Sequence, residues 1–175
     1  MTFKRTQTDQ TQGFTLIELL IVIAIIGLLA TLAIVSLTTA QRKARDTKRL
    51  ADVKQIQNAV EIYYRENNTY PLTDDVNNTT WTEFGTSLDP YTTALPIDPT
   101  NTSPYVYTYG TNAAGIEYFV AVELEQTDHN ALNGDDDNAY AVADAGWEAP
   151  VSFISSDGNS AVALDCVDPM YCLSD

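Results

Sequence analysis

Apolar residues run almost without interruption from Leu19 to Leu37, broken only by Gly27, Thr31 and Ser36. As an α-helix, a segment of this length extends about 28 Å, which is close to the ~30 Å hydrocarbon core of a bilayer. The run is longer than the apolar part of an ordinary secretory signal peptide, and no small-residue cleavage site follows it. The pattern therefore predicts a membrane-spanning helix.

The helical pattern continues beyond the apolar run but becomes one-sided. No Gly or Pro occurs from Leu28 to Asn68, and apolar residues recur at steps of three and four at Leu50, Val53, Ile56, Val60 and Tyr63 or Tyr64. Such a stripe is typical of a helix that packs one face on a domain. The turn-forming residues from Asn67 to Pro71 end the pattern. We predict a single helix from Phe14 to about Asn67.

After Pro71 the chain changes to short stretches of β-branched and aromatic residues separated by polar loops. Residues 105–109 and 117–125 alternate with near period two, and the glycines of 110–115 between them are typical of a hairpin connection. Residues 139–143 and 151–154 are weaker strands, and the Asn/Thr-rich stretch 73–82 reads as a loop. We predict an α+β fold, in which a small antiparallel sheet packs on the C-terminal half of the long helix.

Charge is distributed unevenly along the chain. There are 24 acidic and 9 basic residues, and from Glu66 to Asp175 there are 19 acidic residues without a single Lys or Arg. This segment lacks the cations that neutralise phosphates, which excludes direct nucleic-acid binding by that route. Its acidic surface serves either to keep the domain solvated or to attract cations or a basic partner surface.

The basic residues next to the apolar run make its orientation ambiguous. Lys4 and Arg5 precede the run, whereas a larger basic cluster follows it, at Arg42, Lys43, Arg45, Lys48, Arg49 and Lys54. The positive-inside rule alone would place the C-terminal domain in the cytoplasm. The cysteines and the Thr/Asn-rich acidic surface favour the opposite side. We predict that the domain lies outside the cytoplasm. We also expect the acidic domains of neighbouring subunits to face the basic cluster.

Few residues with catalytic chemistry are present. Cys166 and Cys172 are separated by five residues, which differs from the CxxC spacing of redox and metal sites. They form either a small disulfide loop in an oxidising compartment or two inert thiols. His129 is the only histidine, and no nucleophile–base pair or phosphate-binding loop accompanies it. The sequence therefore favours a structural protein over an enzyme.

One carboxylate, Glu18, stands near the start of the apolar run. A charged side chain at the centre of a membrane helix costs roughly 2.5 to 3.5 kcal/mol, so an anchor alone would not include one. The basic leader followed by Gly13-Phe-Thr-Leu-Ile-Glu18 resembles the type IV pilins and the pseudopilins of type II secretion. That resemblance implies cleavage after Gly13 by a prepilin peptidase, N-methylation of Phe14, and pairing of Glu18 with the N-terminus of a neighbouring subunit during filament assembly.

The resemblance also implies a division of the chain into four parts. They are a leader (1–13), a transmembrane and filament-core helix (14–38), an amphipathic helix (39–68) and an acidic globular sheet domain (69–175). The first function it suggests is a type IV pilus-like filament subunit, and the alternative is a major-type pseudopilin of a type II secretion system. A single-span membrane protein with a ligand- or calcium-binding domain is the alternative of another class.

Partners and location follow from the same resemblance. The implied partners are other copies of the chain, the prepilin peptidase, an assembly platform with minor pilins, and the membrane. The prepilin would be a single-pass protein of the cytoplasmic membrane with its C-terminal domain outside the cytoplasm. The mature chain would then enter a periplasmic or cell-surface filament.

The middle of the chain is similar to the major pseudopilin in particular, through Leu95-Pro-Ile-Asp-Pro99 and the following Tyr105-Val-Tyr107. In that protein a loop after the sheet binds calcium. The matching loop offers the oxygen ligands Asp128, Asn133, Asp135, Asp137 and Asp144. It is not an EF-hand, because Asn138 replaces the usual glycine and Asp144 the usual glutamate. A structural Ca²⁺ site and a solvated acidic loop both remain open.

Overall fold

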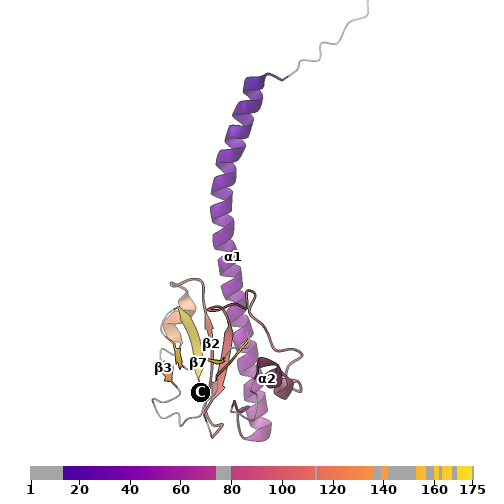
Figure 1. The fold of residues 1–175 in the computed structure, drawn as a ribbon, viewed down its shortest axis with the longest axis vertical. Helices are drawn as coiled ribbons and strands as arrows, with labels where there is room; N and C mark the ends of the chain where they lie inside the picture. The colour runs from indigo at the N-terminus through magenta and orange to yellow at the C-terminus, as the bar shows by residue number, and fades with distance from the viewer. Residues whose placement is uncertain are drawn as a thin grey trace, which may run out of the picture. The chain divides into compact units, whose positions relative to one another are not determined.

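The computed structural model describes residues 14–73, 80–112, 114–135, 139–141, 153–156, 160–161, 163–166 and 169–174 (Figure 1). The expected leader, residues 1–13, lies outside this set. Two compact units make up the chain, Met1–Ala40 and Gln41–Asp175. Helix α1 (Leu16–Asn67) contributes its first part to one unit and its second part to the other.

The first unit contains the apolar part of α1. Every Leu, Ile and Val side chain from Leu16 to Leu37 is at least half exposed, which means that nothing within this unit covers them. The space around Gly27 is equally open, since a Cβ atom placed there would meet no atom within 4 Å. Among the described residues, α1 is the one helix whose length and apolar composition suit a membrane span.

The second unit is an antiparallel sheet with the C-terminal part of α1 packed on it (Figure 1). The sheet has five strands in the order β5-β4-β1-β2-β7, and each neighbouring pair is antiparallel. The strands are β1 (Tyr107–Thr111), β2 (Tyr118–Glu123), β4 (Phe153–Ser155), β5 (Ser160–Ala161) and β7 (Met170–Ser174). The α+β prediction is therefore confirmed.

Three smaller elements complete this unit. Strands β3 (Ala139–Ala141) and β6 (Ala163–Asp165) form a separate two-stranded antiparallel sheet. A short 3₁₀ helix, η1 (Asn130–Gly134), follows β2. Helix α2 (Trp81–Leu88) precedes β1.

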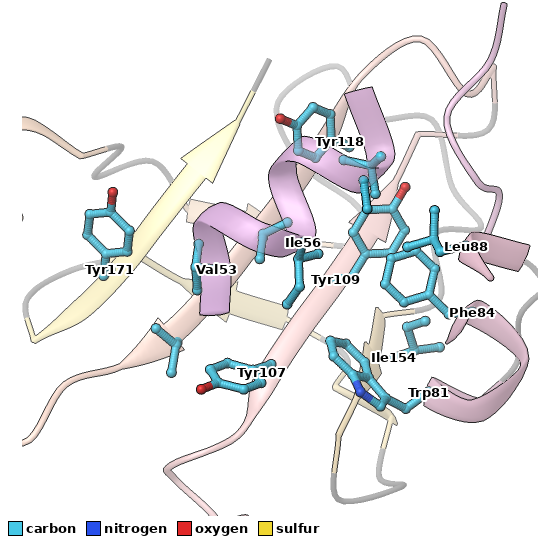
Figure 2. Close-up of a cluster of buried hydrophobic side chains, with 14 of the residues drawn as sticks. Val53, Ile56, Trp81, Phe84, Leu88, Tyr107, Tyr109, Tyr118, Ile154 and Tyr171 are labelled. Atoms are coloured by element: carbon cyan, nitrogen blue, oxygen red, sulfur yellow. The ribbon is translucent and has the colours of Figure 1, made fainter. Parts of the chain in front are cut away.

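The core lies between the stripe of α1, helix α2 and the central strands. Val53, Ile56 and Val60 are completely buried, as the periodicity predicted. Figure 2 shows Val53 and Ile56 among the tyrosine rings of the sheet and the apolar side chains of α2. Aromatic contacts join these elements, and the rings of Phe84 and Tyr109 stack with centroids 4.1 Å apart. Because aromatic side chains bury large areas, they supply much of the domain's apolar contact.

The predicted strands are present with shifted ends. The first begins at Tyr107 instead of 105, because Tyr105 closes a turn by donating its N–H to the carbonyl of Thr102. The second ends at Glu123 instead of 125, because the N–H of Glu125 turns toward Asp46 of α1. The hairpin joining β1 and β2 contains Gly115 at φ 64°, a backbone conformation that favours glycine.

Helix α2 corrects the expectation that residues 73–82 form a loop. Trp81 and Thr82 belong to its first turn, while residues 74–79 lie outside the described residues. Thr80 is the N-cap, since its hydroxyl accepts from the N–H of Glu83 and the carboxylate of Glu83 accepts from the N–H of Thr80. The sequence of a capping box, Thr-x-x-Glu, is present here and was the missed signal for the start of a helix.

Candidate functional site

The first candidate site is the start of α1. The carboxylate of Glu18 accepts hydrogen bonds from the backbone N–H of Thr15 at 2.8 Å and from its hydroxyl at 2.7 Å. The hydroxyl of Thr15 in turn accepts from the N–H of Glu18 at 3.3 Å. The two residues thus form a capping box, and the helix dipole also favours a negative charge in this turn.

This arrangement places Glu18 beside the predicted cleavage point. Phe14, which directly precedes Thr15, is 92% exposed. Gly13 lies outside the described residues, so the peptide bond predicted to be cut is not among them. Within the single chain the carboxylate of Glu18 is satisfied by local hydrogen bonds. Its position at the helix start also leaves it able to accept a bond from an amino group brought there.

The second candidate site is a buried ion cluster around Arg49 of α1. The side chains of Arg49, Asp46 and Asp98 are all 0% exposed. The guanidinium donates to Asp98 Oδ2 at 2.6 Å, to Asp46 Oδ1 at 2.8 Å and to Glu125 Oε1 at 2.9 Å. It also lies over the ring of Tyr105, with 4.6 Å between Cζ and the ring centroid. One cation therefore holds carboxylates from α1, from the loop before β1 and from the segment after β2.

Asp46 joins α1 to the end of β2. Its carboxylate accepts from the backbone N–H groups of Glu125 at 2.9 Å and Gln126 at 3.1 Å, and from the Gln126 side chain at 3.0 Å. Arg45 adds a paired contact, because its Nε and Nη2 donate to the two oxygens of Glu125 at 2.5 and 2.6 Å. Charge-assisted and paired hydrogen bonds of this kind fix orientation as well as position.

Asp98 organises the loop that contains the Leu95–Pro99 motif. Its Oδ1 accepts from the N–H of Thr100 at 2.7 Å, from the Thr100 hydroxyl at 2.6 Å and from the N–H of Asn101 at 3.1 Å. The carbonyl of Pro96 accepts from the Trp81 indole of α2 at 3.2 Å. The motif is thus an acidic turn closed on Arg49 and held against α2.

The cluster shifts the pKa values of its members in the direction expected of ion pairs. Burial alone would raise the pKa of Asp98, but the bonds from Arg49, Thr100 and Asn101 outweigh burial and lower it. The hydrogen bonds from Arg45, opposed by burial and assisted by Arg49, lower the pKa of Glu125 to about 2. Burial acts to lower the pKa of Arg49, yet its carboxylate partners raise it. In each case the partners favour the charged form of the residue, and the pKa shifts accordingly.

Three of the five predicted calcium ligands lie in the described part of the loop. Asp128 and Asn133 are exposed, and Asp135 Oδ2 accepts from the backbone N–H of Cys172 at 3.0 Å. Asp137 and Asp144 lie outside the described residues. No group of three His, Cys, Asp or Glu side chains suited to a metal occurs within the described residues. The calcium site stays a prediction.

The C-terminal cysteines are joined in the structure. Cys166 and Cys172 form a disulfide and both are fully buried. Cys172 lies in β7, opposite Ala121 of β2, so the bridge fastens the segment before β7 to the edge strand of the main sheet. Asp135 binds the same strand, and this links the loop after η1 to the C-terminus.

Comparison with known proteins places the chain in a family. The prokaryotic N-terminal methylation motif matches residues 9–34, and the family described as type II secretion system protein G matches residues 36–139. The second match covers more than half of the 175 residues. The chain belongs to the type II secretion system protein G family. The resemblance found in the sequence is therefore confirmed.

Curated relatives carry the name type II secretion system core protein G. The Escherichia coli protein is 40% identical over 67 residues, which is 38% of this chain and 46% of the relative. The Vibrio cholerae protein is 33% identical over 98 residues, covering 56% and 57% of the two chains, and the Pseudomonas aeruginosa protein is 33% identical over 113 residues, covering 58% and 75%. The chain spans about half the length of the first of these relatives. No solved structure matches it.

The protein G match separates the two candidate sites. The methylation motif includes Gly13, Phe14 and Glu18, whereas the protein G region includes the whole Arg49 cluster and ends at residue 139, before the cysteines. The sequence pattern alone put a type IV pilus first and a pseudopilin second. The family that matches is described by its role in type II secretion, which was the second of these two.

Sequence reasoning did not find the ion cluster. We expected the basic cluster of residues 42–54 to face acidic domains of neighbouring subunits, and for Arg45 and Arg49 this was wrong, since both bind acidic residues of their own chain. The missed signal was spacing: Arg49 lies four residues before Val53, in phase with the buried stripe. A cation in phase with a stripe of core residues requires a buried partner.

Proposed function

We propose that this chain is a major-type pseudopilin, a prepilin that is cut after Gly13, methylated at Phe14 and polymerised through the apolar part of α1 into a type II secretion filament. The role is structural and not catalytic. The observation that carries the proposal is the apolar half of α1, which is exposed on all sides in a chain of the protein G family.

The exposed apolar surface requires a cover. Fifteen Leu, Ile and Val side chains lie between Leu16 and Leu37, each between 50% and 82% exposed. Full burial of one such side chain is worth about 1.5 to 3 kcal/mol, so leaving them all in water is strongly unfavourable. A bilayer covers them in the prepilin, and the same helices of neighbouring copies cover them in a filament.

Glu18 supports a filament over a simple anchor. In the free subunit its carboxylate is bound by Thr15 at the helix start. In a core of packed apolar helices, a carboxylate without a cationic partner is penalised far more than a paired one. After cleavage, the amino group of Phe14 from a neighbouring copy supplies such a partner. Glu18 then sets the register, because a subunit fits only where its charge is met.

The proposed location follows from the membrane segment and the family. The prepilin resides in the cytoplasmic membrane with the sheet domain outside the cytoplasm, where the Cys166–Cys172 bridge is compatible with an oxidising compartment. Its proposed partners are further copies of the chain, the prepilin peptidase and the assembly platform with minor pseudopilins. A structural Ca²⁺ in the acidic loop remains part of the proposal and awaits titration of the chain with Ca²⁺.

Mass spectrometry of the N-terminal peptide tests the proposal. The peptide is compared between membranes, isolated filaments and material sheared from the cell surface. We expect a peptide that begins at Phe14 with one added methyl group and stays with the cell envelope. The same peptide in the sheared surface fraction would indicate a type IV pilus instead. A chain that still begins near Met1 in every fraction would overturn processing and favour a membrane-anchored binding protein.

A further inference from the structure

The acidic residues of α1 in the second unit are all engaged within the chain. Each accepts a hydrogen bond from another side chain, and the four residues are Asp46, Asp52, Glu61 and Glu66. The donors are Arg49 for Asp46, Tyr107 for Asp52, Tyr70 and Tyr118 for Glu61, and Tyr91 for Glu66. Three of the four acids are therefore bound by tyrosine hydroxyls of the domain, which hold the carboxylates against their own chain without removing their charge.

The basic residues of the same helix are divided differently. Arg45 and Arg49 are committed to the ion cluster, and Lys48 pairs with Asp52 at 3.3 Å. Arg42, Lys43, Lys54 and Arg65 are exposed and form no ion pair with any described residue. The nearest polar contact of Lys54 is with the neutral side chain of Gln57, at 3.1 Å.

Three of these cations, Lys43, Lys54 and Arg65, lie in one row. Successive members are 11 residues apart. Eleven residues are about three helical turns, so each member is rotated by only about 20° and displaced by about 16 Å from the one before. Lys43, Lys54 and Arg65, called the cation row below, thus follow one exposed side of α1.

The rest of the chain carries the complementary charge. From Glu66 onward the chain has 19 Asp and Glu side chains and no Lys or Arg. Asp98 and Glu125 are used inside the domain, whereas Asp89, Glu117 and Asp128 are exposed. One chain therefore presents cations on its helix and anions on its sheet domain. Two such copies attract when the helix of one meets the domain of the other.

We propose that the cation row binds the acidic surface of the sheet domain of a second copy of this chain. The contact is heterologous, because different surfaces of the two copies meet, and a heterologous contact that does not close into a ring generates an open helical assembly. The inference rests on the proposed filament function and adds a second interface to the one formed by the apolar half of α1.

Zero-length cross-linking of filaments made by the full chain tests this contact. A carbodiimide activates a carboxylate, the Nζ of a nearby lysine attacks it, and an amide forms while the carbodiimide takes up the water as a urea. Arginine keeps the charge of lysine but does not form this amide. The variant Lys43→Arg/Lys54→Arg should therefore assemble normally, yet lose the covalent dimers that wild-type filaments show on a denaturing gel.

Lys48→Arg is the matched control, because Lys48 is held by Asp52 of its own helix. It should retain the dimers. Filaments of the double variant with undiminished dimers would overturn the cation row while leaving the proposed function in place. A wild-type chain that forms no filaments and no dimers would overturn the proposed function itself.

Neutralising the row provides an independent measurement. Lys54→Gln and Thr82→Glu each make the net charge more negative by one, but Thr82 is an exposed residue of α2 and is not part of the cation row. We expect a loss of filament yield for Lys54→Gln and none for Thr82→Glu. Equal losses in both variants would show that total charge matters instead of the row, and would contradict the proposal, as would equal yields from Lys54→Gln and wild type.

Discussion

Replacing Arg49 by methionine tests whether the ion cluster holds the domain onto α1. Methionine keeps most of the length of the side chain and removes the cation. In the structure this cation donates to three carboxylates and to the hydroxyl of Thr100 at 3.0 Å, and it covers the ring of Tyr105. The variant would leave Asp46 and Asp98 buried without their cationic partner.

The expected cost is large. Removing one partner of a buried ion pair typically destabilises a protein by about 3 to 5 kcal/mol, because the remaining charge stays buried without compensation. Here the side chains of Arg49, Asp46 and Asp98 are 0% exposed, so solvent does not screen the loss. For a domain of this size, each kcal/mol lowers the melting temperature by roughly 3 to 5 °C. Arg49→Met should therefore melt about 10 to 20 °C below wild type.

Thermal unfolding of the full chain in detergent, followed by the near-ultraviolet signal of the buried aromatic side chains, measures this difference. Lys48→Met is the matched control. It removes a cation from the adjacent position, where Lys48 is 54% exposed and pairs with Asp52. Such surface pairs contribute about 0.2 to 1 kcal/mol. If Arg49→Met and Lys48→Met melt at nearly the same temperature, the cluster does not stabilise the domain.

Two further predictions concern Glu125 and Glu18. Folding lowers the pKa of Glu125 to about 2 and also lowers the pKa of Asp98. Their contribution to the free energy of unfolding is therefore complete above the unfolded values near pH 4 and is lost as the pH falls toward about 2. The raised pKa of half-buried Glu123 acts in the opposite direction. The free energy of unfolding of the wild type, measured as a function of pH, should show this decline, and that of Glu125→Gln should decline less steeply. Identical curves for the two proteins would refute the role of Glu125. Glu18→Ala should insert into the membrane but yield no filaments. Normal polymerisation of this variant would contradict the proposal that Glu18 sets the register of subunits.

The long helix and the central hairpin could be predicted because their signals are local. The stripe at Val53, Ile56 and Val60 has helical period, and all three side chains are buried in the structure. The alternating segments that became β1 and β2 are adjacent in sequence and pair in a hairpin. For α1 the pattern that defines the helix also defines the face that it buries, whereas β1 and β2 are buried along almost their whole length.

Strand β7 and the ion cluster were missed because their partners are distant in sequence. β7 pairs with β2, from which it is separated by the whole acidic loop, and its own five residues carry no clear alternation. Arg49 and Asp98 are 49 residues apart. The pattern of apolar and polar residues gives no information on a partner so distant in sequence, so it did not predict this buried pair. The phase of Arg49 with the core stripe was the one local clue.

The position of the cluster along α1 has a physical consequence. Asp46 and Arg49 are the first buried residues of the helix, and up to Leu37 the helix is apolar on every side. Apolar contacts alone would define this point only loosely, because the buried stripe repeats at Val53, Ile56 and Val60 and a helix shifted along its axis would still bury apolar side chains. The ion cluster allows no such shift, since Arg49 must meet Asp98 while Asp46 meets the N–H groups after β2. Buried ionic groups are best attested in this use, where they specify register more than they add stability. Arg49 therefore does for the domain on α1 what we propose that Glu18 does for the subunit in the filament.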